Sequence, residues 1–260
     1  VLGNRFENQV LLIKAAWGGK SLYKDFRPPS SGGEVGKYYT LMLDQVREAL
    51  ANLKTDFPRY DGGGYELAGF VWYHGWNDGV APKTAIPEYE ANLANLIRDV
   101  RKEWNVPALP VVIGELTGPW VEAPREWTKL RQAQAAVATP PEFAGNVRFV
   151  ATHDFVRKPD ESPNPGHGHH EFGNAETYFL VGDALGQGMV SLLEGRTAAS
   201  HQTNSIEGWR VLISGRLLAE EKAATEKALG LLRVQLQEIV RTVPAAAVAK
   251  LREVPLWFSP

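Results

Sequence analysis

The sequence predicts an α/β fold of three layers, with a mainly parallel sheet sandwiched between helices. Over the first 195 residues, short apolar runs that suit buried strands alternate with amphipathic segments that suit helices. This alternation is typical of βαβ units, whose parallel strands are covered on both faces. The length of 260 residues is enough for one such domain and part of another. With 44% apolar and 22% charged residues, the composition is that of a globular protein.

Four strands and four helices are expected in this region. The strands are the apolar runs, at residues 10–17, 67–73, 110–116 and 147–152. The helices are the longer stretches between these runs, in which apolar residues recur at helical spacing or helix-forming residues predominate. They are expected at residues 38–53, 86–104, 124–137 and 174–193.

The composition changes after Gly195. The polar stretch 196–206 is interpreted as a linker between a first domain, residues 1–195, and a second one, residues 207–260. In the second region, the pattern of apolar residues predicts a strand at 209–213, a long helix at about 219–243 and a short strand at 254–258. We interpret it as a partial α+β domain that the sequence begins without completing.

Several classes of protein are disfavoured by composition. The absence of cysteine excludes disulfides, cysteine nucleophiles and thiolate metal sites. A net charge of -2 gives no support to nucleic-acid binding, and no apolar run approaches the roughly 20 residues that span a bilayer. Both ends resemble the interior of a domain, so we expect a piece of a longer protein. The host, the compartment and the oligomeric state are left open.

Ligands of parallel sheets bind at the carboxyl ends of the strands, so the residues after each predicted strand are the candidates for a site. The first block is Gly18-Gly19-Lys20-Ser21, after strand 10–17. A glycine pair there lets backbone N–H groups approach a ligand oxygen. The end of a phosphate-binding loop is an alternative, although that motif needs a glycine where Lys14 stands. A plain turn is another.

The second block follows strand 67–73 and contains Tyr73, His74, Trp76, Asn77 and Asp78. Aromatic rings at a strand end can stack on sugars, and imidazole or amide N–H groups can donate to an oxyanion. The alternative is an aromatic corner in which Asn77 and Asp78 cap the next segment.

The third block precedes the helix predicted at 174–193 and contains His167, His169 and His170. A histidine here could be the general base for a serine hydroxyl. Three histidines within four positions could instead bind a metal ion, or form a solvated loop.

Together these blocks, over about residues 1–195, resemble the SGNH hydrolases of the sialate O-acetylesterase and acetylxylan esterase type. The resemblance implies an SGNH or flavodoxin-like sandwich. It implies oxyanion donors at Gly18 or Gly19, with His74 in the place of the usual glutamine and Asn77 beside it. His170 matches the base histidine. The acid that often stands three residues earlier is replaced by His167, so Asp154, or failing that Asp160, is the expected orienting carboxylate.

The same resemblance implies an acylated, in particular O-acetylated, carbohydrate as substrate, without a metal or organic cofactor. Contacts to the sugar are expected from these side chains: Trp17, Tyr73, Trp76, Asp78 and His169. Family members are often exported, which suggests a secreted or periplasmic location by analogy. The sugar and the acyl group are left open.

The Gly-Gln-Ser-Asn block that carries the nucleophile in that family occurs nowhere in the sequence. Ser21 lies in the oxyanion turn and is not favoured as its substitute. We therefore expect the serine to precede Val1 and this chain to be inactive by itself. Alternatives are a non-catalytic carbohydrate-binding domain and a metal-dependent hydrolase built on the histidine cluster. Residues 208–260 resemble the start of a metallopeptidase-like domain fused to such esterases, but no His-Glu-x-x-His motif is present.

Overall fold

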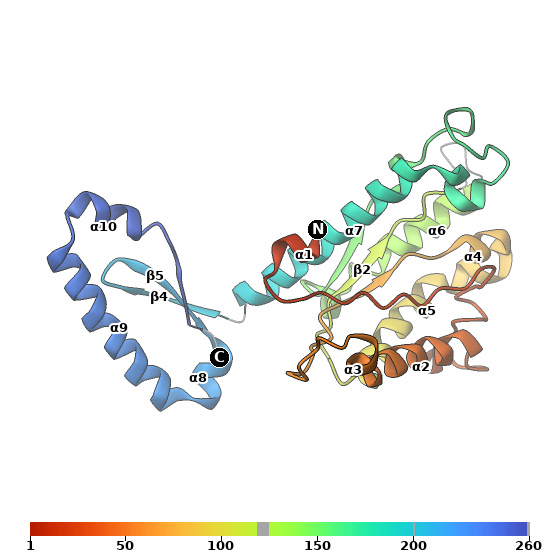
Figure 1. Cartoon of the computed structure of the whole chain (residues 1–260). Helices are drawn as coiled ribbons and strands as arrows, with labels where there is room; N and C mark the ends of the chain where they lie inside the picture. Colours follow the sequence, from red (N-terminus) through yellow and green to blue (C-terminus); the bar gives the residue numbers. More distant parts are fainter. Residues whose placement is uncertain (119–124, 200, 259–260) are drawn as a thin grey trace. The chain divides into compact units, whose positions relative to one another are not determined.

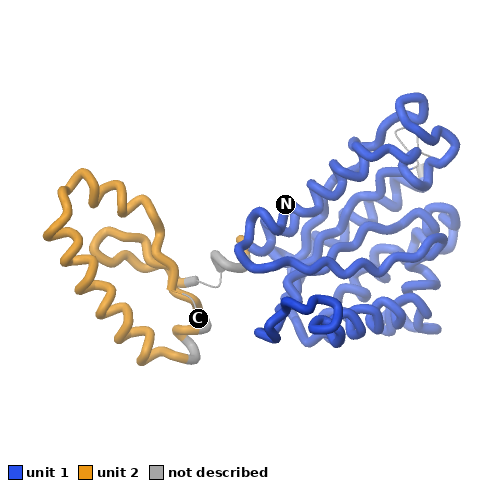
Figure 2. Tube along the Cα trace, in the orientation of Figure 1, with its two compact units in different colours: residues 1–193 blue, residues 194–260 orange. Residues whose placement is uncertain are grey.

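A computed structural model describes residues 1–118, 125–199 and 201–258 (Figure 1). The chain divides into two compact units, Val1–Leu193 and Glu194–Pro260 (Figure 2). The first unit has hydrophobic clusters on both faces of its sheet, and the second has a hydrophobic core of its own.

The first unit is built on a parallel sheet of three strands in the order β1-β2-β3. They are β1 (Phe70–Trp72), β2 (Val111–Gly114) and β3 (Val147–Val150). The register pairs Val71 with Val112, and Val112 with Arg148. The central strand β2 is buried throughout, as expected for a strand covered on both faces. The predicted α/β fold with a parallel sheet is confirmed, with strands shorter than their apolar runs.

Helices cover both faces of this sheet (Figure 1). Because side chains alternate along a strand, Val111 and Ile113 of β2 point to one face and Val112 points to the other. The first pair packs in a cluster with α2 (Lys37–Ala51), α5 (Pro82–Glu103) and α6 (Arg125–Ala136). Val112 packs against α7 (Ala175–Ala199) through Val181, Leu185 and Met189. The three-layer arrangement follows from this division.

All four helices predicted for the first unit are present. Position 124 of the third predicted helix lies outside the described residues. The remaining short helices are α1 (Leu2–Arg5), α3 (Leu53–Asp56) and α4 (Trp76–Val80), with 3₁₀ turns at Pro29–Ser31, Pro141–Phe143, His153–Phe155, Pro159–Glu161 and Gly168–Gly173. Among the described residues, no helix combines the length and apolar character needed to cross a membrane.

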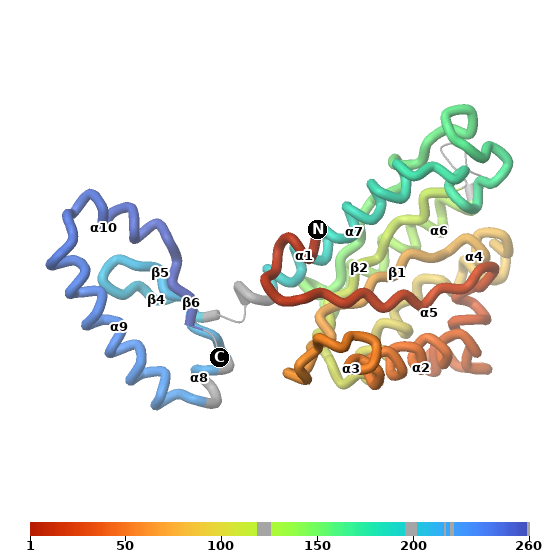
Figure 3. Tube along the Cα trace, in the orientation of Figure 1, coloured from red at the N-terminus to blue at the C-terminus, as the bar shows by residue number. Residues whose placement is uncertain are grey.

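The strand predicted at residues 10–17 is wrong. This segment is an extended trace without a strand partner among the described residues (Figure 3). Leu12 is 78% exposed, and only Ile13, Ala15 and Trp17 are half-buried. Hydrophobicity alone predicted the strand, but a strand also needs a neighbour to take up its backbone hydrogen bonds. The other strands of this unit have such neighbours.

The second unit contains a three-stranded sheet and helices. Strand β4 (His201–Ile206) pairs antiparallel with β5 (Trp209–Ser214), and β5 pairs parallel with β6 (Leu256–Phe258). The helices are α8 (Gly215–Glu220), α9 (Lys222–Thr242) and α10 (Ala245–Leu251). The core gathers Trp209, Val211 and Ile213 of β5 with Leu236 of α9 and Val248 of α10. The predicted strands and long helix are present.

The interpretation of residues 196–206 as a linker is wrong in its local structure. Helix α7 continues to Ala199, and residues 201–206 form β4. Strand β4 is at an edge of its sheet, and Gln202, Thr203 and Ser205 are exposed. An edge strand with one solvated face tolerates a polar sequence, so its composition resembles that of a linker.

Replacing Ile113 by alanine should lower the free energy of unfolding of the first unit by about 3 kcal/mol, because a cavity opens at the centre of β2. Urea-induced unfolding followed by tryptophan fluorescence measures the loss. Val71→Ala on β1 is the matched control, because this side chain is 45% exposed. Equal losses in the two variants would contradict the central position of Ile113.

Candidate active site

The carboxyl ends of three parallel strands bring polar residues to one edge of the sheet. The loop of Tyr73 and His74 follows β1, Glu115 and Thr117 follow β2, and His153 follows β3. This is the edge at which α/β proteins bind ligands. Two hydrogen-bond networks connect these ends to the remaining blocks.

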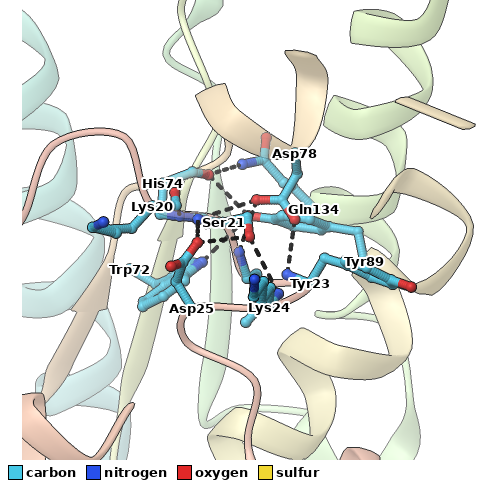
Figure 4. A network of polar contacts seen from close by, with 11 residues as sticks. Lys20, Ser21, Tyr23, Lys24, Asp25, Trp72, His74, Asp78, Tyr89 and Gln134 are labelled. Carbon is cyan, nitrogen blue, oxygen red and sulfur yellow. Dashed lines mark hydrogen bonds and ion pairs between the residues drawn. The ribbon is translucent and has the colours of Figure 1, made fainter. Parts of the chain in front are cut away.

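The first network fixes the Gly18–Ser21 turn to the end of β1 (Figure 4). Asp78 accepts hydrogen bonds from the backbone N–H groups of Leu22, at 2.8 Å, and Tyr23, at 3.0 Å. The His74 Nε2 atom lies 2.9 Å from the carbonyl oxygen of Lys20. The first two blocks, more than 50 residues apart in the sequence, are therefore held together directly.

The His74 imidazole is packed among aromatic rings. Its centroid lies 4.7 Å from that of Trp72 and 5.6 Å from that of Phe26. Burial lowers the pKa of His74, so the neutral ring donates its Nε2–H to Lys20. Because this N–H group is occupied, the structure does not place His74 as the predicted oxyanion donor. It anchors the turn instead.

The backbone of this loop is also secured. The hydroxyl of Tyr89 and the side-chain amide of Gln134 donate to the carbonyl oxygen of His74, at 2.9 and 2.8 Å (Figure 4). Tyr89 and Gln134 are fully buried on α5 and α6. The end of β1 is thus attached to two helices of one layer.

Asp78 is 0% exposed, which does not fit the predicted direct contact with a sugar. Burial raises the pKa of its carboxyl, while His74 and the N–H groups of Leu22 and Tyr23 oppose that rise. Both carboxylate oxygens are used by the turn, so the structure assigns this residue a structural position. Its placement beside His74 could not be derived from the sequence.

Gly18 and Gly19 remain available as hydrogen-bond donors. Both are exposed, and a Cβ atom added at either would meet nothing within 4 Å. Among the described residues their N–H groups make no hydrogen bond. The side-chain amide of Asn77, half-buried in α4, also has no partner in the described part of the chain. These donors could therefore bind a ligand oxygen without losing an existing contact.

The histidine block adjoins the second block through Trp76. The Trp76 ring lies 5.9 Å from that of His169 and 4.9 Å from that of Trp127. A Cβ atom at Gly118 would come within 2.3 Å of the Trp76 ring, so a glycine is needed for this close approach. His170 is exposed, with its ring 4.3 Å from that of His169. Its imidazole makes no hydrogen bond with any described residue.

The second network, which sequence reasoning missed, is centred on Glu171. This side chain is only 5% exposed. Its Oε1 atom accepts hydrogen bonds from the hydroxyls of Thr117, at 2.5 Å, and Tyr73, at 3.2 Å. Burial raises the pKa values of both Glu171 and Tyr73. The histidine block is thus attached to the ends of β1 and β2.

His153 extends this network to the end of β3. Its Nδ1 atom lies 2.7 Å from the carbonyl oxygen of Thr117, and its backbone N–H donates to Glu115 Oε2 at 3.0 Å. The backbone N–H of Thr152 donates to the same carboxylate oxygen at 3.1 Å. The positions of Glu115 and Thr117, directly after an apolar run, were the signal that could have identified this cluster.

The comparison with protein families decides the class of protein. Residues 2–178 match the model of a family described as carbohydrate esterase, sialic acid-specific acetylesterase. The chain belongs to this family. The comparisons with curated proteins and with solved structures gave no match. The predicted resemblance to sialate O-acetylesterases is confirmed at the level of the family, with acetylated sugars as its class of substrate. The matched range contains all three blocks.

Within this carbohydrate esterase, the carboxylates that were predicted to orient His170 make no described hydrogen bond with it. Asp154 and Asp160 are exposed, and neither makes a hydrogen bond with His170 in the described part of the chain. The buried carboxylate next to His170 is that of Glu171. Burial and hydrogen bonding, rather than distance along the sequence, distinguish the candidates.

The predicted sugar contacts differ in exposure. Trp17 is half-buried and packs at 5.2 Å against the ring of Tyr38, and the Tyr73 hydroxyl is engaged by Thr117 and Glu171. Trp76 is half-buried, whereas His169 is exposed. Of these side chains, that of His169 is the most exposed. Among the residues the structure describes, no group of three His, Asp or Glu side chains is arranged to hold a metal ion.

Replacing Asp78 by alanine should lower the free energy of unfolding by about 2–3 kcal/mol, because it leaves two buried N–H groups without an acceptor. Asp78→Asn keeps one acceptor oxygen and should lose less. Amide hydrogen exchange at Leu22 and Tyr23 should accelerate in both variants.

Asp25→Ala is the control for this prediction. Asp25 accepts from the backbone N–H of Ser21, at 2.8 Å, but is only half-buried, so its removal should have a smaller effect. Unchanged exchange at Leu22 and Tyr23 in Asp78→Ala would show that the carboxylate does not hold the turn.

Proposed function

We propose that the protein hydrolyses O-acetyl esters of sialic acids or related sugars by a serine–histidine mechanism in which His170 is the general base. Membership of the family supports the substrate class. The observation that carries the mechanism is the pair of links at the end of β1. His74 contacts Lys20 of the glycine turn, and Trp76 contacts His169 of the histidine block.

In the proposed first step, the serine hydroxyl attacks the carbonyl carbon of the ester while His170 takes up its proton. The tetrahedral intermediate then collapses, His170 returns the proton to the sugar oxygen, and the deacetylated sugar leaves. In the second step His170 takes a proton from water, which attacks the acetyl-serine, and His170 then returns that proton to the serine oxygen as acetate leaves. The sequence contains no Gly-Gln-Ser-Asn block, so this mechanism takes its serine from outside these 260 residues.

The negative charge that develops on the carbonyl oxygen needs donors that are fixed in advance. The N–H groups of Gly18 and Gly19 and the amide of Asn77 supply them in this proposal, each contributing a few kcal/mol to transition-state stabilisation. His74 and Asp78 support them indirectly by holding the turn. This division of roles follows from the hydrogen bonds that the two buried side chains already make.

Binding of an acylated carbohydrate without catalysis is the second candidate function. It is favoured by the missing nucleophile block together with the Trp76 and His169 surface, which suits stacking on a sugar. The two functions differ in whether a protein that contains the serine turns over an ester.

The test is an assay of a protein extended upstream to include a Gly-Gln-Ser-Asn block, with p-nitrophenyl acetate and an O-acetylated sialic acid as substrates. His170→Ala should lower kcat/KM by about 10³-fold or more, because the base is removed. The 260-residue chain alone should be inactive.

Glu161→Gln is the control, because Glu161 is an exposed residue whose side chain pairs with the exposed Lys158. It should retain full activity, and chelators should have no effect. An extended protein that binds acetylated sugars without turnover would favour the binding function, and full activity of His170→Ala would refute the mechanism.

A further inference from the structure

In the described part of the chain, Glu171 is a carboxylate with hydrogen bonds to only one of its oxygens. Oε1 accepts hydrogen bonds from Thr117 and Tyr73, whereas Oε2 is buried and has no hydrogen-bond partner among the described residues. A buried charge with incomplete hydrogen bonding is unfavourable for folding. Burial correspondingly raises the pKa of this carboxyl.

The backbone at this position is also unfavourable. Glu171 has φ 49° and Phe172 has φ 53°, in the left-handed region that residues with a side chain rarely adopt. Strained conformations of this kind persist where the surrounding structure enforces them, and they concentrate at functional sites. Two independent features therefore lower the stability of the fold at the same residue.

The groups that interact electrostatically with Glu171 come from four segments. Tyr73 follows β1, His153 follows β3, His170 precedes Glu171 in the loop, and Tyr178 lies on α7. Only the two histidines can carry a positive charge, and both lower the pKa of Glu171. Both imidazoles therefore lie within electrostatic range of the Glu171 carboxylate.

We infer that Glu171 is a positioning residue of the esterase site, which holds the His170 loop against the ends of β1 and β2 and stabilises the imidazolium formed when His170 takes up a proton. This inference rests on the proposed function for the role of His170. It gives the site the carboxylate that Asp154 and Asp160, both exposed, do not supply.

Glu171→Gln tests the inference because it preserves the shape and one acceptor oxygen but removes the charge. The carboxyl holds its proton more tightly in the folded than in the unfolded protein, so stability is lost as the pH rises through the folded-state pKa. The variant lacks this loss. In the 260-residue chain it should melt at a higher temperature than the wild type at about pH 8, and the difference should shrink towards pH 4.5, the unperturbed pKa.

The extended, serine-containing protein provides the second measurement. There Glu171→Gln should lower kcat about 10- to 100-fold with KM nearly unchanged, because the charge acts on the proton transfer rather than on sugar binding. A gain in stability combined with a loss of kcat distinguishes a functional charge from a structural one.

Two matched variants sharpen the result. Thr117→Val removes a donor to Oε1 and should lower the melting temperature at about pH 8. Glu161→Gln removes an exposed charge and should change neither stability nor activity. A lower melting temperature of Glu171→Gln at both pH values, or an unchanged kcat, would overturn the inference. An inactive wild-type extended protein would instead refute the proposed function, and with it the catalytic role of Glu171.

Discussion

The arrangement of the candidate site depends on the two hydrogen bonds that Asp78 accepts from the backbone of the Leu22–Tyr23 segment. They connect a segment without strand partners to the end of β1, which is itself fixed in the sheet by its pairing with β2. Because the donors are backbone amides, the connection depends on the position of the turn rather than on the side chains at those two residues. Without it, no described strand pairing would hold the Gly18–Gly19 turn near the end of β1.

The end of β1 organises the site on both faces of the sheet. Successive residues of an extended chain point to opposite sides, so Tyr73 and His74 reach different layers. Tyr73 packs on the α7 side and joins Thr117 and Glu171, whereas His74 packs against Phe26 and Trp72 in the other cluster. One strand end therefore positions the histidine block on one side and the glycine turn on the other.

Local pattern was enough to predict the long helices, the three paired strands of the first unit and the segments in which the candidate site residues lie. Apolar spacing is set by burial of an element, and the position of ligand-binding loops is set by the parallel topology. The same information misplaced residues 10–17 and 196–206, because strand formation depends on a partner that lies elsewhere in the sequence. Local pattern also failed for Asp78. A carboxylate after a strand end was predicted to contact the sugar, but this side chain is buried. Hydrogen-bond partners such as Thr117 and Glu171 are 54 residues apart, and no periodicity in the sequence relates them.

Some buried polar atoms of the candidate site have no hydrogen-bond partner among the described residues. In the described part of the chain, four buried side-chain atoms lack a hydrogen-bond partner, and two of them, His74 Nδ1 and Glu171 Oε2, belong to the site. Each residue is nevertheless fixed by its other polar atom, His74 through Lys20 and Glu171 through Thr117. A residue held in this way keeps its position while one titratable atom stays free of internal bonds. Such an arrangement lowers stability, and burial of the partly bonded group, more than the charges around it, then moves its pKa away from the ordinary value, downward for His74 and upward for Glu171.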